Sequence, residues 1–321
     1  MCFWMNALDS LNSDNFVLAT FPAWARLKAA PNQQLDDATF YAGAGLSSLE
    51  QIVRRSPSWI GVWRQRLALT AAAASMRMIG RSEGEQDLRD AWLLRRPGDD
   101  AGPAGRVLLL WRRLSQRSTD SSRDGILGAG EALGLVLGER AGEIEAAASA
   151  LLLSERTAID AAAELCTAVI ALVPHGELLA LWLAEIVLAQ KLRWPIPVPL
   201  LAGQLGHRFL RSAESGRRPR PTDAGWHRSV CLAYALGSAH ANDLAHDLSR
   251  RAQKLQDAVP KLRAKGAVSV TTALLEDDAI APSARLSGMS DRGMRRLFDR
   301  LVSLGVVREL SGRDTFRLYG L

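Results

Sequence analysis

The chain has 321 residues, of which 48% are hydrophobic and 23% are charged, and its net charge is +6. This balance is ordinary for a globular protein and argues against a disordered polymer, and the length allows two domains. No apolar run reaches the eighteen or more residues that a membrane span needs, because the best run, residues 178–189, is interrupted by Glu185.

The first 35 residues predict a poorly structured lead-in, because turn-forming residues break any periodic pattern there. The start of the chain has no basic segment followed by an apolar core, so it does not predict a secretory signal. Cys2, Cys166 and Cys231 are far apart and form no C-x-x-C pair, which argues against a disulfide framework or a structural zinc site. We therefore expect a reducing, bacterial-type cytoplasm as the location.

Residues 36–258 predict a helical domain, because Ala and Leu dominate, no segment alternates as a strand would, and turn residues punctuate the chain. The tryptophans of this domain are expected to fill its core, and it could also mediate a homo-oligomer. Helices are expected over residues 38–56, 58–79, 104–114, 126–141, 143–172, 177–192 and 199–212, with two further helical stretches within 226–258. Breaks are expected near residue 57, residues 97–103, residue 174, residues 195–199 and residues 215–225.

Glycines recur every four residues at positions 130, 134, 138 and 142. This spacing would place them along one side of a helix over residues 126–141. Because each glycine weakens a helix by about 1 kcal/mol relative to alanine, such a helix would need a closely packed neighbour. No strand precedes these glycines, so they do not predict a phosphate-binding loop.

Two clusters of charged residues are candidates for chemistry. The denser one could bind a metal or do acid–base work, but its spacing also suits a solvated helix with ion pairs, which is the favoured interpretation. The other has a His–His spacing of six, which does not fit a zinc helix. Since no P-loop or nucleophile motif is present either, no catalytic residue, metal or cofactor is assigned. The clusters are Arg81, Glu83, Glu85, Asp87, Arg89 and Asp90, and His240, Asp243, His246 and Asp247.

Residues 267–321, the C-terminal module, predict a winged helix-turn-helix. A helix is expected over 267–280, a further helical turn over 281–286, an amphipathic helix over 290–305, and a β-hairpin, the wing, over 306–319. The fold class is therefore an all-α helical body with a small C-terminal winged helix-turn-helix of three helices plus a β-hairpin. This fold is used mostly to dock a helix in the major groove of duplex DNA.

The helix over 290–305 carries the strongest local signals of the chain. Ser290 predicts its N-cap and Gly305 its end. An apolar stripe would face the core, and the wing would pack through Phe316 and Leu318. Arginines occupy the other faces, where guanidinium groups could contact bases or phosphates, and Arg313 stands at the tip of the wing. The stripe is Met294, Leu297, Phe298, Leu301 and Val302. The candidate DNA-binding residues are Ser290, Arg292, Arg295, Arg296, Arg300, Arg313 and Arg317.

The positive charge lies mostly just before this module. Residues 207–265 hold 12 Lys and Arg against 5 Asp and Glu, a balance of +7, whereas residues 268–321 hold 8 against 7. Such an excess suits a nucleic-acid partner, although a solvated surface explains it too. A continuous basic face that joins Arg217 and Arg218 to Arg292, Arg296 and Arg313 would favour DNA.

Most of the chain after about residue 35 resembles an uncharacterised family, named only as a domain of unknown function. That family is found in plant-associated alphaproteobacteria, often on plasmids. The final hairpin also resembles the winged helix attached to some Fic-type proteins, without a Fic catalytic motif. The resemblance implies no activity. The similar segments are residues 64–69 (RQRLAL), 88–92 (LRDAW), 97–106 (PGDDAGPAGR), 192–201 (LRWPIPVPLL), 243–248 (DLAHDL) and 289–321.

The sequence therefore predicts a DNA-binding protein, a regulator or an accessory factor of a replicon or mobile element, that docks duplex DNA through its C-terminal module. Two alternatives stay open. Asp291, Asp299, Glu309 and Asp314 dilute the positive field and suit a module that docks on another protein instead. An enzyme with a carboxylate site among Glu83, Glu85, Asp87 and Asp90 is the other alternative.

Overall fold

The computed structural model describes residues 18–28, 35–96, 98–116, 121–212, 215–262, 266–284, 286 and 288–321. Within them the chain forms eleven α-helices and one two-stranded sheet, which confirms a mostly helical protein. Of the expected lead-in, residues 1–17 and 29–34 lie outside the described residues. Residues 18–28 include the 3-10 helix η1 (Ala23–Ala25), whose Ala25 is buried.

The helices follow one another with short connections. They are α2 (Leu35–Arg55), α3 (Ile60–Met78), α4 (Glu85–Leu93), α5 (Gly102–Gln116), α6 (Arg123–Ala132), α7 (Arg140–Leu153), α8 (Ala158–Leu172), α9 (Glu177–Leu192), α10 (Trp226–Ala258), α11 (Ala267–Glu276) and α12 (Asp291–Ser303). Three further 3-10 turns are η2 (Ala202–Gln204), η3 (Arg208–Leu210) and η4 (Val259–Lys261). The helix expected over residues 199–212 is therefore replaced by two 3-10 turns, η2 and η3.

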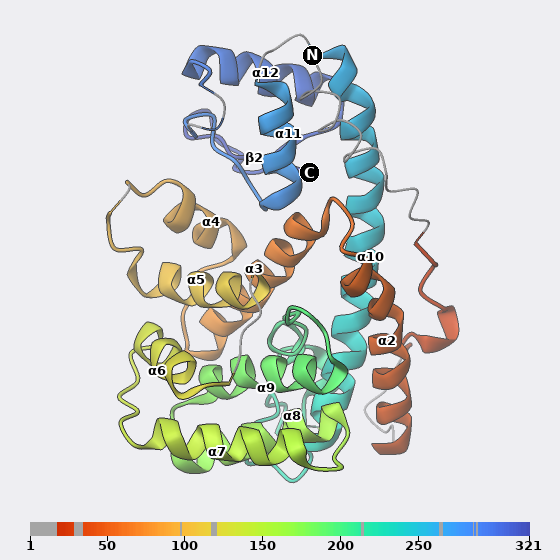
Figure 1. Ribbon diagram of the computed structural model, residues 1–321, viewed down its shortest axis with the longest axis vertical. Coiled ribbons are helices and arrows are strands. Elements are labelled where there is room, and N and C mark those ends of the chain that lie inside the picture. Colours follow the sequence, from red (N-terminus) through yellow and green to blue (C-terminus); the bar gives the residue numbers. More distant parts are fainter. Residues whose placement is uncertain are drawn as a thin grey trace.

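Helix α10 is the longest element, and it joins the two ends of the molecule (Figure 1). Its 33 residues correspond to about 50 Å of helix axis, with α8 near one end and α12 near the other. The expected two stretches are thus one helix. Gly237 lies inside this unbroken helix. A Cβ at this position would lie 2.5 Å from the main-chain oxygen of Leu200, which is too close for any other residue. This glycine allows the segment after α9 to approach the α10 backbone closely.

The four-residue glycine repeat does not form a stripe on one helix. Helix α6 ends at Ala132, and Gly134 and Gly138 have φ angles of +72° and +56°. These left-handed values favour glycine and interrupt a right-handed helix, so the repeat encodes turns between α6 and α7. The long helix expected over residues 143–172 is likewise divided. Thr157 caps α8, its side chain accepting a hydrogen bond from the Asp160 N–H at 3.2 Å.

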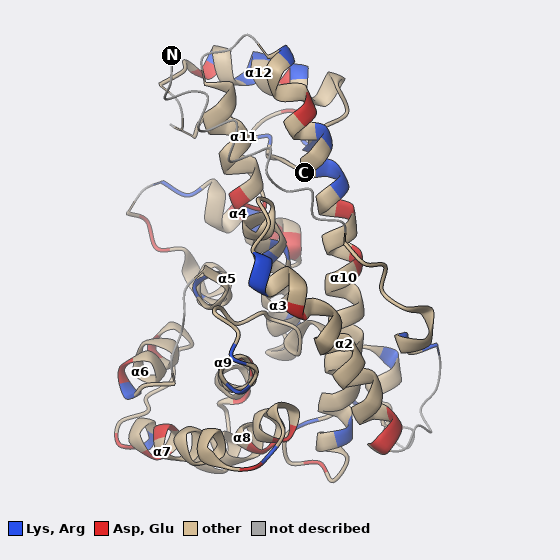
Figure 2. Ribbon diagram, turned by 45° about the vertical axis from the view of Figure 1, so that its right-hand side comes forward, with Lys and Arg blue, Asp and Glu red and all other residues tan. Residues whose placement is uncertain are grey.

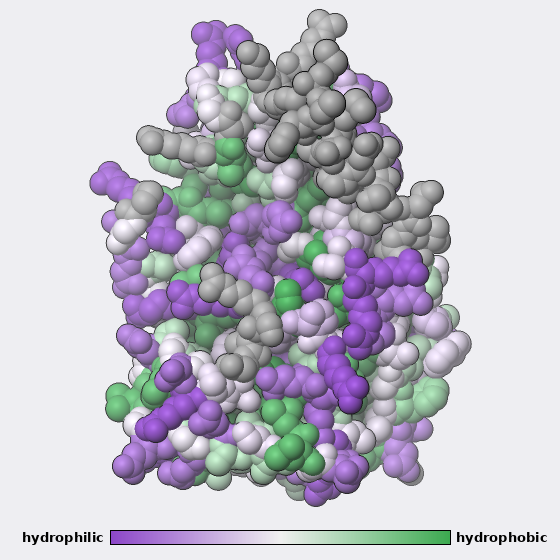
Figure 3. All heavy atoms as spheres, viewed as in Figure 1, coloured by the Kyte–Doolittle hydropathy of each residue, from purple (hydrophilic) through white to green (hydrophobic). Residues whose placement is uncertain are grey.

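The core runs without interruption from the body into the C-terminal module. Trp63 and Trp111 are fully buried in the same cluster that includes Phe298 and Leu321. None of the described helices combines the length and the apolar character that crossing a bilayer requires. On the face shown in Figure 3, apolar residues form small patches separated by hydrophilic ones.

In the C-terminal module, α11 and α12 are followed by β1 (Arg308–Glu309) and β2 (Tyr319–Gly320), which pair antiparallel. The register places Arg308 opposite Gly320, and Ile280 forms a bridge to Tyr319. The expected helical turn over residues 281–286 is not formed by the described residues 281–284 and 286, which make turns instead. The module thus has two helices and a shorter sheet than expected.

Two expected core positions of the module are wrong. Phe316 is 73% exposed and has a φ angle of +54°, because residues between the two strands form bends rather than a continuous hairpin. Val302, at the edge of the apolar stripe of α12, is 40% exposed. Leu318 is buried as expected, and Tyr319 takes the core position expected of Phe316: its ring stacks on Phe298 with centroids 4.5 Å apart.

Replacing Phe298 with leucine should lower the free energy of unfolding by about 1–2 kcal/mol, because the substitution removes the stacked ring pair and part of the buried surface. Urea unfolding monitored by circular dichroism would measure this change. Phe316→Leu is the matched control and should leave stability unaltered, since its ring is already in solvent. Equal effects of the two substitutions would contradict the assigned burial of Phe298.

Candidate nucleic-acid interface

Helix α12 begins and ends where its sequence predicts. The Ser290 hydroxyl accepts a hydrogen bond from the Gly293 N–H at 3.2 Å, and Gly305 after the helix has a φ angle of +67°. Met294, Leu297, Phe298 and Leu301 are buried. The faces that remain outside are therefore those that carry the arginines.

Arg292, Arg295, Arg296 and Arg300 are all exposed on α12. None of them forms an ion pair with another side chain in the described part of the chain. Figure 2 shows this helix at one end of the molecule, with Lys and Arg on it and on the neighbouring end of α10. Asp291 and Asp299 are also exposed on α12 and weaken its positive field.

A groove of about 600 Å³ lies between α12 and the segment after α10. We call it the basic groove, because three of the described side chains that line it are cationic and none of them is acidic. Its lining is partly apolar, through Leu262, Met289 and Leu297. The lining residues are Lys261, Leu262, Met289, Gly293, Arg296, Leu297 and Arg300.

The two candidate arginines of the wing are held away from this groove. Arg313 Nη2 lies 2.6 Å from Asp90 Oδ1 of α4, so the tip of the wing is ion-paired with the helical body. Arg317 Nε donates to the main-chain oxygen of Arg313 at 3.0 Å, and its guanidinium lies 3.7 Å from Asp314. The structure thus brings together the arginines of α12 and separates them from those of the wing.

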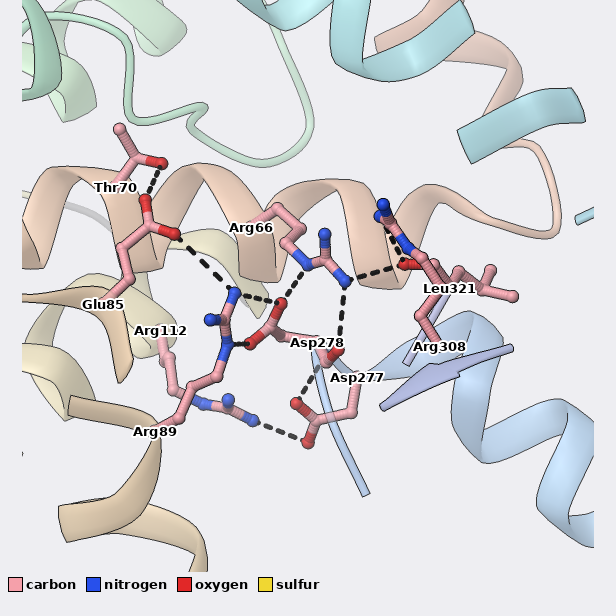
Figure 4. A network of polar contacts seen from close by, with 9 residues as sticks. All are labelled: Arg66, Thr70, Glu85, Arg89, Arg112, Asp277, Asp278, Arg308 and Leu321. Carbon is pink, nitrogen blue, oxygen red and sulfur yellow. Dashed lines mark hydrogen bonds and ion pairs between the residues drawn. The ribbon is translucent and has the colours of Figure 1, made fainter. Parts of the chain in front are cut away.

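Polar contacts centred on Asp278 fasten the C-terminal module to the body (Figure 4). Asp278 is only 3% exposed and forms ion pairs with Arg66 of α3 and Arg89 of α4, the latter with Nε 2.5 Å from Oδ2. Arg66 also donates to the main-chain oxygen of Leu321 at 3.0 Å. Burial by itself would raise the pKa of Asp278, but Arg66 and Arg89 outweigh it and hold that pKa below its ordinary value.

The neighbouring contacts extend this network along α4 and α5. Arg112 of α5 forms an ion pair with Asp277, with Nη2 2.7 Å from Oδ2. Gln86 Nε2 donates to the main-chain oxygen of Ser311 at 2.6 Å. A small apolar cluster of Ala279, Ala281 and Leu318 packs against Leu93 and Leu94 beside it. The module is therefore a docked part of the fold, with the segment between β1 and β2 against the body.

The acidic cluster that included Glu83, Glu85, Asp87 and Asp90 is dispersed among structural roles. Glu83 pairs with Arg81. Glu85 accepts a hydrogen bond from the Thr70 hydroxyl at 2.9 Å, and Asp87 accepts one from the Gly84 N–H at 2.9 Å. Asp90 holds Arg313, so each carboxylate has a structural contact in this ion-paired segment.

The histidine cluster on α10 is also divided. Asp243 pairs with Arg26 of the segment before α2, and Asp247 pairs with Arg251 at 2.7 Å. His246 Nε2 lies 3.1 Å from the main-chain oxygen of Ala19. Among the described residues, no group of three or more His, Cys, Asp and Glu side chains is arranged to hold a metal ion.

The basic stretch of residues 207–265 does not form one continuous face with α12. Arg217 and Arg218 precede the first turn of α10, whereas α12 lies near its last turns, about 50 Å of helix away. Arg218 is moreover paired with Glu177, with Nη1 2.5 Å from Oε1. The continuous basic face that would have favoured DNA, joining these two arginines to those of the module, is therefore not formed, because α10 separates the ends of the stretch.

Lys261 was not among the residues singled out from the sequence. It is the last residue of η4, is exposed, and lines the basic groove opposite Arg296 and Arg300. The signal that could have identified it is the alternation of cations over residues 261–265, directly before the module. Sequence spacing could not place it against α12, because about thirty residues intervene.

A second buried carboxylate, Glu185 of α9, lies far from α12, and no function was assigned to it from the sequence. Its Oε1 accepts hydrogen bonds from the Leu200 and Leu201 N–H groups, both at 2.6 Å. Complete burial raises the pKa of Glu185 to about 8, although the two N–H donors act in the opposite direction. The side chain therefore anchors the segment after α9, and its raised pKa favours the protonated form more than that of an exposed glutamate does.

Comparison with known proteins confirms an uncharacterised family named only as a domain of unknown function. No curated protein matches the chain. A family described as "Protein of unknown function (DUF1403)" matches residues 9–321, which is nearly the whole chain and includes both the helical body and the C-terminal module. The chain therefore belongs to the DUF1403 family of proteins of unknown function.

Proposed function

We propose that the chain binds duplex DNA through α12, with α11, α12 and the β1–β2 hairpin acting as a module of the winged-helix type. In this proposal the helical body carries and orients the module, and the protein serves as a regulator or as an accessory factor of a replicon or mobile element. A homo-oligomer formed through the body stays a prediction alongside it.

The observation that carries the proposal is the pattern of burial and charge on α12. One side of the helix is buried through Phe298 and Leu301, while Arg292, Arg295, Arg296 and Arg300 project outward. Guanidinium groups that form no ion pair with another described residue can meet phosphates or the edge of guanine without first breaking such a contact. Ser290, at the exposed N-cap, could contribute a further phosphate contact.

Protein docking is a second candidate. Asp291 and Asp299 lie among the arginines, and Val302 leaves apolar surface on the same helix. A partner with both charges would suit this mixture better than a polyanion would. Binding that persists at high salt and needs no nucleic acid would favour this alternative.

Substituting arginines of α12 tests the proposal. Arg292→Ala and Arg296→Ala should each weaken DNA binding by about 1–3 kcal/mol if the side chain contacts a base edge. Arg308→Ala should have a smaller effect, because Arg308 is turned toward the main-chain oxygen of Leu321 at 3.4 Å. Fluorescence anisotropy with labelled duplex at two salt concentrations would measure the differences.

Arg217→Ala is the matched control, since it removes one exposed arginine at the opposite end of α10. It corrects for the loss of net charge and should leave affinity unchanged. The proposal fails if the wild-type protein shows no salt-dependent binding to duplex DNA. It also fails if Arg217→Ala weakens binding as much as Arg296→Ala does.

A further inference from the structure

In many DNA-binding modules of this type the wing supplies a second contact beside the recognition helix, but here the wing is engaged elsewhere. Arg313 is paired with Asp90 at 2.6 Å, and Ser311 accepts a hydrogen bond from Gln86. Leu318 packs against the Leu93–Leu94 end of α4. A duplex contact through the tip would require these contacts with the body to break.

The other side of α12 is open. There the basic groove separates α12 from the end of α10, and Lys261 stands across from Arg296 and Arg300. Lys261 is exposed, and its side chain has no hydrogen bond or ion pair with another described residue. The groove thus presents cations from two elements that are distant in sequence, and none of its described lining residues is a carboxylate.

We propose that the basic groove holds the sugar–phosphate backbone of the duplex that α12 contacts, so that Lys261, and not the wing, supplies the second DNA contact. This inference rests on the proposed function. Charge complementarity identifies the occupant, because phosphates alternate with less polar sugars along a strand. Lys261, Arg296 and Arg300 would neutralise the phosphates, while Leu262, Met289 and Leu297 would face the sugars.

The salt dependence of binding distinguishes a contact to phosphate from a contact to a base. Each phosphate contact on duplex DNA contributes about −0.9 to the slope of log K against log salt concentration. Loss of Lys261 should therefore reduce the magnitude of that slope by about one and weaken binding several-fold on every duplex sequence. A base contact would instead change the preference among sequences.

The experiment compares the full-length wild type with Lys261→Ala, Lys261→Arg, Arg317→Ala and Arg217→Ala. Affinity for two unrelated 24-base-pair duplexes is measured by anisotropy over a series of salt concentrations. Lys261→Ala should reduce the magnitude of the slope, and weaken the affinity, by the same amount on both duplexes. Lys261→Arg should keep the wild-type slope and affinity. Arg317→Ala in the wing and Arg217→Ala at the far end of α10 should behave as wild type.

The outcomes separate the inference from the function on which it rests. Absence of salt-dependent binding by the wild type rejects the proposed function and the inference together. If the wild type binds duplex DNA and Lys261→Ala has the same salt slope as the wild type, the inference alone is rejected. If Arg317→Ala then has a salt slope of smaller magnitude, the second contact belongs to the wing. Thermal unfolding of each variant verifies that it is folded. Because Lys261 is exposed, its substitution should leave the fold unchanged.

Discussion

Replacing Asp278 with asparagine should lower the free energy of unfolding by about 3–5 kcal/mol, since removing one partner of a buried ion pair leaves the other charge uncompensated. Asp278 lies between Arg66 and Arg89, both of which have little exposure. Asparagine fills the same space but cannot neutralise either guanidinium. Both arginines would then stay charged in the contact between the C-terminal module and the body.

Urea unfolding at pH 7 would measure this effect. Asp314→Asn is the control. Asp314 is fully exposed and its ion pair with Arg317 is long, at 3.7 Å, so its loss should not change the free energy of unfolding measurably. In addition, hydrogen exchange in α11 and β2 should accelerate in the Asp278 variant, since its contacts hold this module against α3 and α4. A stability equal to that of the Asp314 variant would show that the network does not fasten the module.

The ion pairs of Asp278 also predict how the stability of the protein depends on pH in the acid range. Because the pKa of Asp278 is lowered in the folded protein, its contribution to stability is present above the ordinary pKa of an aspartate. It is lost as the pH falls through the lower, folded-state value. The wild type should therefore lose stability in acid relative to Asp278→Asn, so that the difference between the two proteins narrows there.

Replacing Glu185 with glutamine should remove a loss of stability that the wild type suffers as the pH rises from about 4.5 to about 8. The folded-state pKa of Glu185 is about 8, against an ordinary value of 4.5. A raised pKa contributes stability that is fully present below pH 4.5 and is lost as the pH rises through 8. At 1.36 kcal/mol per pH unit between these values, the full loss is on the order of 5 kcal/mol.

Glutamine keeps the oxygen that accepts hydrogen bonds from Leu200 and Leu201, and it has no proton to lose. Unfolding free energies at pH 5, 7 and 9 should thus fall in the wild type and stay nearly level in Glu185→Gln. Glu164→Gln, at an exposed carboxyl paired with Arg156, should follow the wild-type profile. Parallel profiles for the wild type and Glu185→Gln would show that this carboxyl is not the source of the pH dependence.

Features that depend on a few neighbouring residues could be predicted from the sequence alone. The N-cap at Ser290, the stop at Gly305 and the buried stripe through Leu297 and Phe298 all follow from spacings within one helix. The mostly helical class follows from composition in the same way. Because caps and periodicity act over three or four residues, these signals do not depend on the rest of the fold.

The spacing of the glycines did not by itself show whether they lie in a helix or in turns. A spacing of four is compatible with a helix face, yet Gly134 and Gly138 adopt positive φ angles in turns, whereas Gly237 lies inside α10. The choice depends on what packs nearby: the main-chain oxygen of Leu200 approaches Gly237 closely, and nothing lies within 4 Å of a Cβ built on Gly134. Such contacts join distant parts of the chain, and periodicity contains no information about them.

The candidate interface shows the same division. That α12 would expose arginines was evident from its sequence, because the apolar stripe leaves them no other side. Only the tertiary structure decided that Arg313 meets Asp90, 223 residues away, and that Lys261 and Arg296 line the same groove. Local propensity determines which faces a helix offers, whereas the packing of elements distant in sequence determines which charges are neutralised within the protein and which remain available to a partner.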